Sequence, residues 1–137
     1  MPEVPTPGGH AWDADELDRI GAADELQLAS RRSDGTLRPY VTMWVVRLDD
    51  HLYVRSAGGP DRPWYRHALA SGTGRIRAGG TEADVGFGRS GGTVEGDIDA
   101  AYHSKYDRYG AGIVGHVVGP EAHSVTIRLV PTRPELS

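Results

Sequence analysis

The side chains with the greatest potential for chemistry are three phenols and one ammonium group, Tyr102, Lys105, Tyr106 and Tyr109. Their spacing places all four on one face of a helix that should begin after Asp97 and stop at Gly110. On a cleft wall, this tyrosine stripe would offer hydrogen-bond donors, stacking faces and an anion contact. On a core-facing surface it would only pack, with the lysine stem along apolar surface and its ammonium group in water.

A second candidate site is the run RSAGGPDRPWYR, residues 55–66. It should pass from a strand end through a Gly58-Gly59 turn into the N-terminus of a helix. This arrangement offers backbone amides, a hydroxyl group and up to three guanidinium groups, and these donors suit a phosphate. The opposing interpretation is that Asp61 caps the helix itself and repels an anion.

Two familiar motifs lack the setting that their chemistry requires. The GxGxxG pattern of residues 110–115 follows a helix, whereas a dinucleotide site needs a strand that leads into one, so we predict a flexible loop. The GxSxG pattern of residues 88–92 has no predicted helix behind Ser90, so we predict a turn. The six histidines form no short cluster with carboxylates, and no metal site is expected.

Composition narrows the class of protein. A chain of 137 residues fits one domain, and the absence of cysteine excludes a disulfide scaffold, a thiolate nucleophile and sulfur-ligated metal. A net charge of -4 without a basic stripe argues against nucleic acid and anionic membrane surfaces. The first 12 residues lack the features of a signal peptide, and no apolar run could span a bilayer. We therefore expect a soluble, cytoplasmic protein.

The elements that must position these residues can be read from periodicity and turn signals. Residues 1–11 are expected to form a flexible tail, and residues 12–137 a single domain. The predicted helices cover 13–21, 61–72 and 97–110, and the predicted strands cover 26–32, 40–46, 51–56, 75–78, 82–88 and 122–130. Six strands joined by short connections, with nineteen glycines and nine prolines, predict a mainly β (α+β) fold. The expected architecture is a small antiparallel barrel of about six strands with three flanking helices.

Beyond Trp12, the chain resembles an uncharacterised bacterial domain-of-unknown-function family of the split β-barrel, flavin-reductase-like and pyridoxamine-phosphate-oxidase-like group. The resemblance rests on WVVR at 44–47, YVRS at 53–56, WYR at 64–66, and AAY at 100–102 followed by KY at 105–106. It implies a split barrel. The SAGG run at 56–59 with WY at 64–65 is also similar, more distantly, to deazaflavin-dependent nitroreductases, in which this region holds cofactor phosphate.

This resemblance, taken with the two candidate sites, implies a small oxidoreductase that binds FMN or a deazaflavin coenzyme and acts on a small organic substrate, while the cofactor carries the hydride chemistry. The phosphate contacts and the aromatic wall of the cofactor site are assigned to Trp44, Arg55, Ser56, Gly58, Gly59 and Trp64. The groups assigned to face the substrate, as catalytic residues, are Tyr102, Lys105 and Tyr106.

Two alternatives stay open. One is a cofactor-free barrel that binds or transforms a small molecule in a cleft lined by the tyrosines and Lys105. The other is a structural domain in which the tyrosine stripe packs a core or a dimer contact. A homodimer is expected, because related barrels commonly build their cofactor site across a two-fold axis.

Overall fold

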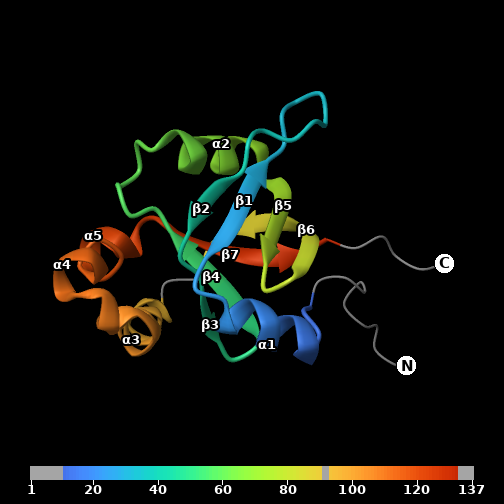
Figure 1. Ribbon diagram of the computed structural model, residues 1–137. Helices are drawn as coiled ribbons and strands as arrows, with labels where there is room; N and C mark the ends of the chain where they lie inside the picture. The colour runs from blue at the N-terminus through green and yellow to red at the C-terminus, as the bar shows by residue number, and fades with distance from the viewer. Residues whose placement is uncertain (1–10, 91–92, 133–137) are drawn as a thin grey trace.

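The computed structural model describes residues 11–90 and 93–132, which form one curled antiparallel sheet with helices around it (Figure 1). The strands are β1 (Leu26–Ser30), β2 (Val41–Met43), β3 (Val46–Leu48), β4 (His51–Arg55), β5 (Thr73–Ala78), β6 (Thr81–Gly88) and β7 (Thr126–Pro131). The helices are α1 (Ala14–Ala22), α2 (Pro63–Ser71), α3 (Glu95–Tyr106), α4 (Ala111–Val114) and α5 (Pro120–His123), with a 3-10 turn η1 (Asp107–Tyr109) after α3. The predicted split barrel is confirmed.

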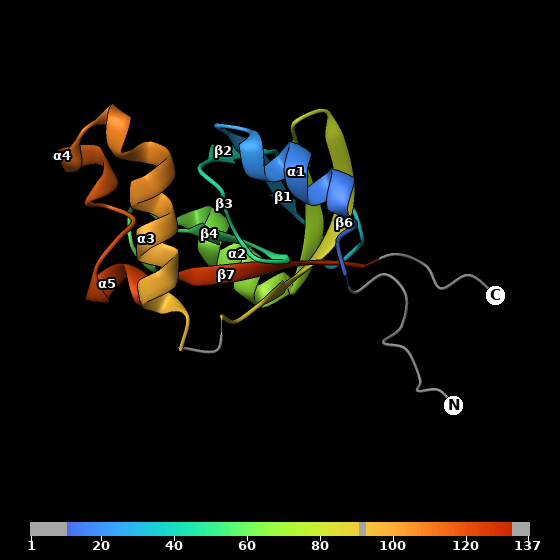
Figure 2. The same ribbon diagram turned by 90° about the horizontal axis from the view of Figure 1, so that it is seen from below.

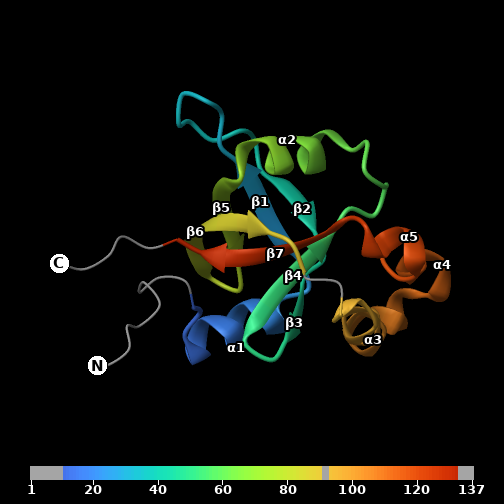
Figure 3. The ribbon, with the colours of Figure 1, turned by 180° about the vertical axis from the view of Figure 1, so that it is seen from behind.

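The sheet has the strand order β2-β1-β5-β6-β7-β4-β3. Strand β7, the last in the chain, lies between β6 and β4 and thereby joins the two halves of the sheet (Figure 3). Its residue Leu129 is the register partner of both Phe87 on β6 and Leu52 on β4. Because Leu129 is buried, this pairing closes the curl of the sheet around apolar side chains.

Two hydrophobic cores fill the molecule. The larger core lies inside the curled sheet, and it includes Leu17 and Ile20 of α1 and Leu129 of β7. The smaller core lies between strands β3 and β4 and the helices α3 and α4. Helices α3, α4 and α5 gather on one side of the sheet, as the view from below shows (Figure 2). We call these three helices the helical lobe.

Local signals at the start of the domain were sufficient to predict α1. The Asp13 carboxylate accepts a hydrogen bond from the Glu16 amide at 2.8 Å, and the Glu16 carboxylate accepts one from the Asp13 amide at 3.1 Å, so the two residues form a capping box. Trp12 and Leu17 are both buried, as a hydrophobic staple requires. The Trp12 indole also donates to the carbonyl of Leu129 at 3.0 Å, which ties the chain entry to β7.

The single strand predicted for residues 40–46 is wrong. The chain instead forms β2 and β3, which lie at opposite edges of the sheet and are separated by Trp44 and Val45. The break is possible because side chains replace the missing ladder partners of Val45. The Tyr106 hydroxyl accepts the Val45 amide at 3.1 Å, and the Lys105 ammonium group donates to the Val45 carbonyl at 2.7 Å.

Several predicted boundaries also shift. Helix α3 begins at Glu95 after Val94 rather than after Asp97, and α2 follows Arg62 rather than Asp61, with no side-chain cap in either helix. The stretch predicted as a flexible loop contains α4, and residues predicted to start the last strand form α5. None of the described helices is long and apolar enough to cross a membrane. Residues 1–10 of the predicted tail (1–11) and the end of the GxSxG motif at 91–92 lie outside the described residues.

Replacement of Gly74 tests the packing of β5 against β1. A Cβ atom there would lie 2.2 Å from the Ala29 carbonyl oxygen and 2.8 Å from the Phe87 ring. We expect Gly74→Ala to lower the free energy of unfolding by about 1–3 kcal/mol in urea denaturation. The matched control is Gly96→Ala in α3, where a Cβ atom meets nothing within 4 Å, and it should be neutral or slightly stabilising. Equal stability of the two variants would contradict the close approach of β5 to β1.

Candidate functional site

The candidate site is a cavity of about 460 Å³ at the break between β2 and β3. Its walls come from four parts of the chain: Glu25 before β1, residues 42–44 beside the break, the region from the end of β4 to the start of α2, and α4 with the segment after it. Trp44, Gly58, Arg62, Trp64 and Val117 are among the lining residues. The loop from β4 to α2 reaches toward the helical lobe (Figure 1), so the cavity lies between the lobe and the sheet.

The indole of Trp44 is held in place from behind. It stacks on the Tyr106 ring with the centroids 4.0 Å apart and an angle of 6° between the planes. The Tyr106 ring is itself fully buried, and its hydroxyl lies 2.7 Å from the Asp24 carbonyl. Trp44 therefore presents a flat apolar surface whose orientation is set by the core.

The turn between β4 and α2 brings backbone close to the cavity. Gly59 has a φ of 92°, which favours glycine, and its amide donates to the Ser56 carbonyl at 3.0 Å. The Ser56 hydroxyl donates to the Gly59 carbonyl at 2.6 Å, so its proton is used within the turn. Within the described part of the chain, the amides of Ala57 and Gly58 donate no hydrogen bond. They are available to an anion at this side of the cavity.

Arg62 lies across this turn. A Cβ atom on Gly58 would lie 1.6 Å from the Arg62 Nε atom, so the guanidinium group occupies the space that a side chain at Gly58 would need. Both residues line the cavity, and both are exposed. The turn and Arg62 therefore place one exposed positive charge and two backbone amides on the same wall of the cavity.

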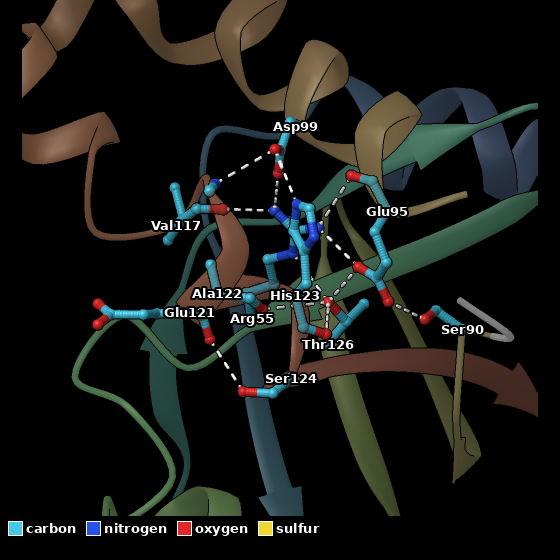
Figure 4. A network of polar contacts seen from close by, with 11 residues as sticks. Arg55, Ser90, Glu95, Asp99, Val117, Glu121, Ala122, His123, Ser124 and Thr126 are labelled. Carbon is cyan, nitrogen blue, oxygen red and sulfur yellow. Dashed lines mark hydrogen bonds and ion pairs between the residues drawn. The ribbon is translucent and has the colours of Figure 1, made fainter. Parts of the chain in front are cut away.

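Arg55 has a different role from Arg62. Its side chain is fully buried, although the residue borders the cavity, and all five of its N–H groups are bound (Figure 4). Nε donates to the Thr126 hydroxyl at 2.8 Å. Nη1 donates to the Val117 carbonyl at 2.6 Å and to the Asp99 carboxylate. Nη2 donates to the Glu95 carboxylate at 2.7 Å and to the Glu95 carbonyl at 3.2 Å. Arg55 thus joins β4 to α3, to β7 and to the segment between α4 and α5.

The two carboxylates beside Arg55 are stabilised in their charged form. Burial alone would raise the pKa of Glu95, but hydrogen bonds from Ser90, Arg55 and Thr126 outweigh burial and lower the pKa below its usual value. Burial would likewise raise the pKa of Asp99, whereas hydrogen bonds from His123, Arg55 and the Gly119 amide lower it. The two carboxylates are therefore members of an ion-pair network around the buried Arg55 (Figure 4), and neither of them is a free catalytic acid.

The tyrosine stripe packs the smaller core. Tyr102 and Tyr106 are fully buried, and burial raises the pKa of both phenols. Burial lowers the pKa of Lys105 to about 8, and its ammonium group is bound to the Val45 carbonyl. Tyr109 lies at the surface, where its hydroxyl donates to the Asp24 carboxylate at 2.8 Å. The core-packing interpretation of the stripe is therefore the one that the structure supports.

The predicted site residues fall into three groups. Trp44, Arg55, Gly58 and Trp64 come together around the cavity. Ser56 and Gly59 shape the adjacent turn without lining the cavity, and Tyr102, Lys105 and Tyr106 lie behind it. The lining residues outside both predicted sites are Glu25, Thr42, Met43, Ile113, His116 and Val117. Ala57 and Arg62 lie within the candidate run 55–66, although neither was assigned to the cofactor, whereas His116 carries no sequence signal that relates it to the turn.

The described residues contain no group of three or more acidic or histidine side chains placed to hold a metal ion. In the Arg55 network, the arginine already neutralises Glu95 and Asp99. The chemistry that the cavity offers is instead that of a flat aromatic wall, exposed backbone amides and a guanidinium group.

The comparisons with known proteins agree with this architecture. A family described as uncharacterised protein conserved in bacteria (DUF2255) matches residues 16–129. No curated protein shows significant sequence similarity to the chain.

Several solved structures share the fold. One is a FAD-binding protein from Mesorhizobium loti, with a TM-score of 0.54 and 20% identity over 90% of this chain and 92% of that one. Another is an F420 reductase, with a TM-score of 0.53 and 16% identity over 88% of this chain and 94% of that one. A third is a FAD and heme binding protein from Mycobacterium smegmatis, with a TM-score of 0.50 and 14% identity over 88% of this chain and 66% of that one.

Removal of the Arg55 guanidinium group should cost most of the stability of the fold. Arg55→Met leaves Glu95 and Asp99 without their partner, and we expect a loss of about 3–5 kcal/mol in the free energy of unfolding. Arg47→Met is the control, because Arg47 pairs with Asp18 at the surface and should cost less than about 1 kcal/mol. Urea denaturation measures both variants. A loss at Arg55 no larger than the loss at Arg47 would disprove the network as a stabilising element.

The same network should make the protein sensitive to acid. The pKa values of Glu95 and Asp99 are lower in the folded chain than in the unfolded chain, so their contribution is present above the unfolded value near 4 and is lost as the pH falls through the folded values. We expect Asp99→Asn to reduce stability at pH 7 and to flatten its decline between pH 5 and 3. The surface variant Asp18→Asn should follow the wild-type curve. Denaturation at a series of pH values checks this, and an unchanged slope for Asp99→Asn would refute it.

Proposed function

We propose that this chain, which belongs to the DUF2255 family of bacterial proteins, is a small oxidoreductase that binds a flavin or deazaflavin coenzyme and acts on a small organic substrate. The coenzyme would bind in the cavity between Trp44 and the Gly58 turn. When bound, it supplies the hydride chemistry, and the protein supplies binding and orientation.

The observation that carries this proposal is the pairing of an aromatic wall with an anion-binding turn in one cavity. A flavin or deazaflavin joins a flat ring system to a phosphate-bearing side chain. Trp44 and Trp64 offer flat apolar surface to a ring, and Arg62 with the Ala57 and Gly58 amides offers donors to a phosphate. A volume of about 460 Å³ is within the usual range of small-molecule sites.

The residues of the turn would divide the work. Arg62 and the amides of Ala57 and Gly58 would contact the phosphate, because these residues line the cavity and their donors are not used within the described part of the chain. Ser56 and Gly59 would hold the turn in shape through their reciprocal hydrogen bonds. Arg55 would be a positioning residue, since a direct phosphate contact would require it to give up a carboxylate or carbonyl partner.

The substrate would meet the outer part of the cavity. Among the described lining residues, Glu25 and His116 carry groups that exchange protons with water, and both are exposed. A proton that accompanies hydride transfer would pass through one of these groups or through solvent. The buried Tyr102 and Tyr106 hydroxyls have no such access.

The structural neighbours support the class of coenzyme. They include a FAD-binding protein, an F420 reductase and a FAD and heme binding protein, and all share this fold at low sequence identity. We further expect a homodimer in the cytoplasm, as related barrels build their cofactor site across a two-fold axis. Light scattering after size-exclusion chromatography measures the oligomeric state directly.

Titration of the purified protein with FMN, FAD and the deazaflavin coenzyme F420, followed by ligand and tryptophan fluorescence, tests the proposal. We expect saturable binding of at least one of them at micromolar concentration. Arg62→Gln should weaken that binding by about 1.5–3 kcal/mol, which is roughly tenfold to a hundredfold, because a charge-assisted contact is lost. Arg19→Gln removes the same charge from a surface pair with Asp15 and should leave affinity unchanged. Failure of all three coenzymes to bind would reject the proposal.

A further inference from the structure

A second cavity, of about 450 Å³, lies at the other end of α2 from the Gly58 turn. It is lined by the C-terminal residues of α2, by Thr73 and by the hairpin that connects β1 to β2. Figures 1 and 3 show this hairpin beside α2 at the top of the molecule. We propose that the cavity binds the phosphate group of a phosphorylated small molecule, at a site separate from the coenzyme cavity.

The residues that line this cavity are mostly basic or polar. Arg31, Arg32 and Arg38 line the cavity with His67, and none of the described lining residues is a carboxylate. The chain as a whole has a net charge of -4 and Arg31 is paired with the Asp84 carboxylate, so Arg32 and Arg38 give the cavity its excess positive charge. Guanidinium groups bind phosphate through paired N–H donors, and this positive charge favours an anion.

Two of these arginines are held by hydrogen bonds. Arg31 donates to the Asp84 carboxylate and the Gly35 carbonyl, and Arg32 donates to Thr36 and to the Leu37 carbonyl. These bonds fix the shape of the hairpin around the cavity. Arg31 and Arg32 therefore hold the hairpin in shape, and their guanidinium groups also line the cavity.

Arg38 is different from the other two arginines. Its Nε atom is buried and has no hydrogen-bond partner in the described part of the chain. An unpaired buried N–H group costs free energy, and this cost is recovered when an acceptor arrives. Because Arg38 also lines the cavity, a phosphate oxygen is the acceptor that the surroundings favour.

A neighbouring groove defines the rest of the ligand. This groove, of about 230 Å³, shares Arg38 and His67 with the arginine-lined cavity described above, which we call the basic cavity. It is otherwise lined mainly by apolar residues such as Pro39, Pro63 and Trp64. A ligand with its phosphate at Arg38 could therefore place an apolar or aromatic body along the groove. The class of ligand is a phosphate monoester with a small apolar body.

Calorimetric titration with phenyl phosphate, inorganic phosphate and phenol tests this assignment. We expect phenyl phosphate to bind saturably, inorganic phosphate to bind more weakly, and phenol not to bind. Arg38→Gln should weaken phenyl phosphate binding at least tenfold, and Arg38→Lys should give an intermediate loss, because it keeps the charge without the Nε donor. Arg19→Gln is the control for net charge and should bind as the wild type does. Circular dichroism checks that the variants are folded.

Three results would overturn the proposal. The first is the absence of phenyl phosphate binding in the wild type. The second is equal loss in Arg19→Gln and Arg38→Gln, which would indicate attraction by net charge alone. The third is a parallel loss of flavin or F420 affinity in Arg38→Gln, which would make the basic cavity a part of the coenzyme site. If Arg38→Gln loses phenyl phosphate binding but keeps its coenzyme affinity, the phosphate site is distinct from the coenzyme site. The test of this site and the test of the proposed function can then fail independently.

Discussion

The buried guanidinium group of Arg55 is the interaction on which the arrangement of the helical lobe depends. A charged group without access to water must have every donor satisfied, and the partners of Arg55 come from α3, from β7 and from the segment between α4 and α5. These partners are far apart in the sequence and meet only in the folded chain. The position of Val117, which forms part of the cavity wall, is thus set by a side chain that contacts its carbonyl from the sheet.

A second long-range constraint sets the opposite wall. Tyr106 and Lys105 supply the hydrogen bonds that Val45 would otherwise have made in a sheet, and the Tyr106 ring supports Trp44. The strand break and the aromatic wall are therefore two results of one contact between α3 and the sheet. The tyrosine stripe contributes to the cavity from behind, through the orientation of Trp44, and not by facing a ligand.

Local signals predicted much of the fold. The capping box at Asp13 and the Gly79-Gly80 turn between β5 and β6 depend only on neighbouring residues, and both are present in the structure. The break at Trp44 was not predictable, because the sequence there alternates like a strand and its replacement partners lie 60 residues away.

The candidate site, like the fold, could be predicted from the sequence only where local residues decide the structure. The Gly58-Gly59 turn could be found from the sequence because Gly59 has a φ of 92°, a backbone conformation that favours glycine. The burial of Arg55 could not, since arginine at a strand end is usually exposed and only the fold supplies Glu95 and Asp99. Trp64 borders both the cavity beside Trp44 and the groove that leads to Arg38. Any ligand that shifts this indole from one side alters the affinity on the other, and by thermodynamic reciprocity the coupling has the same magnitude in both directions.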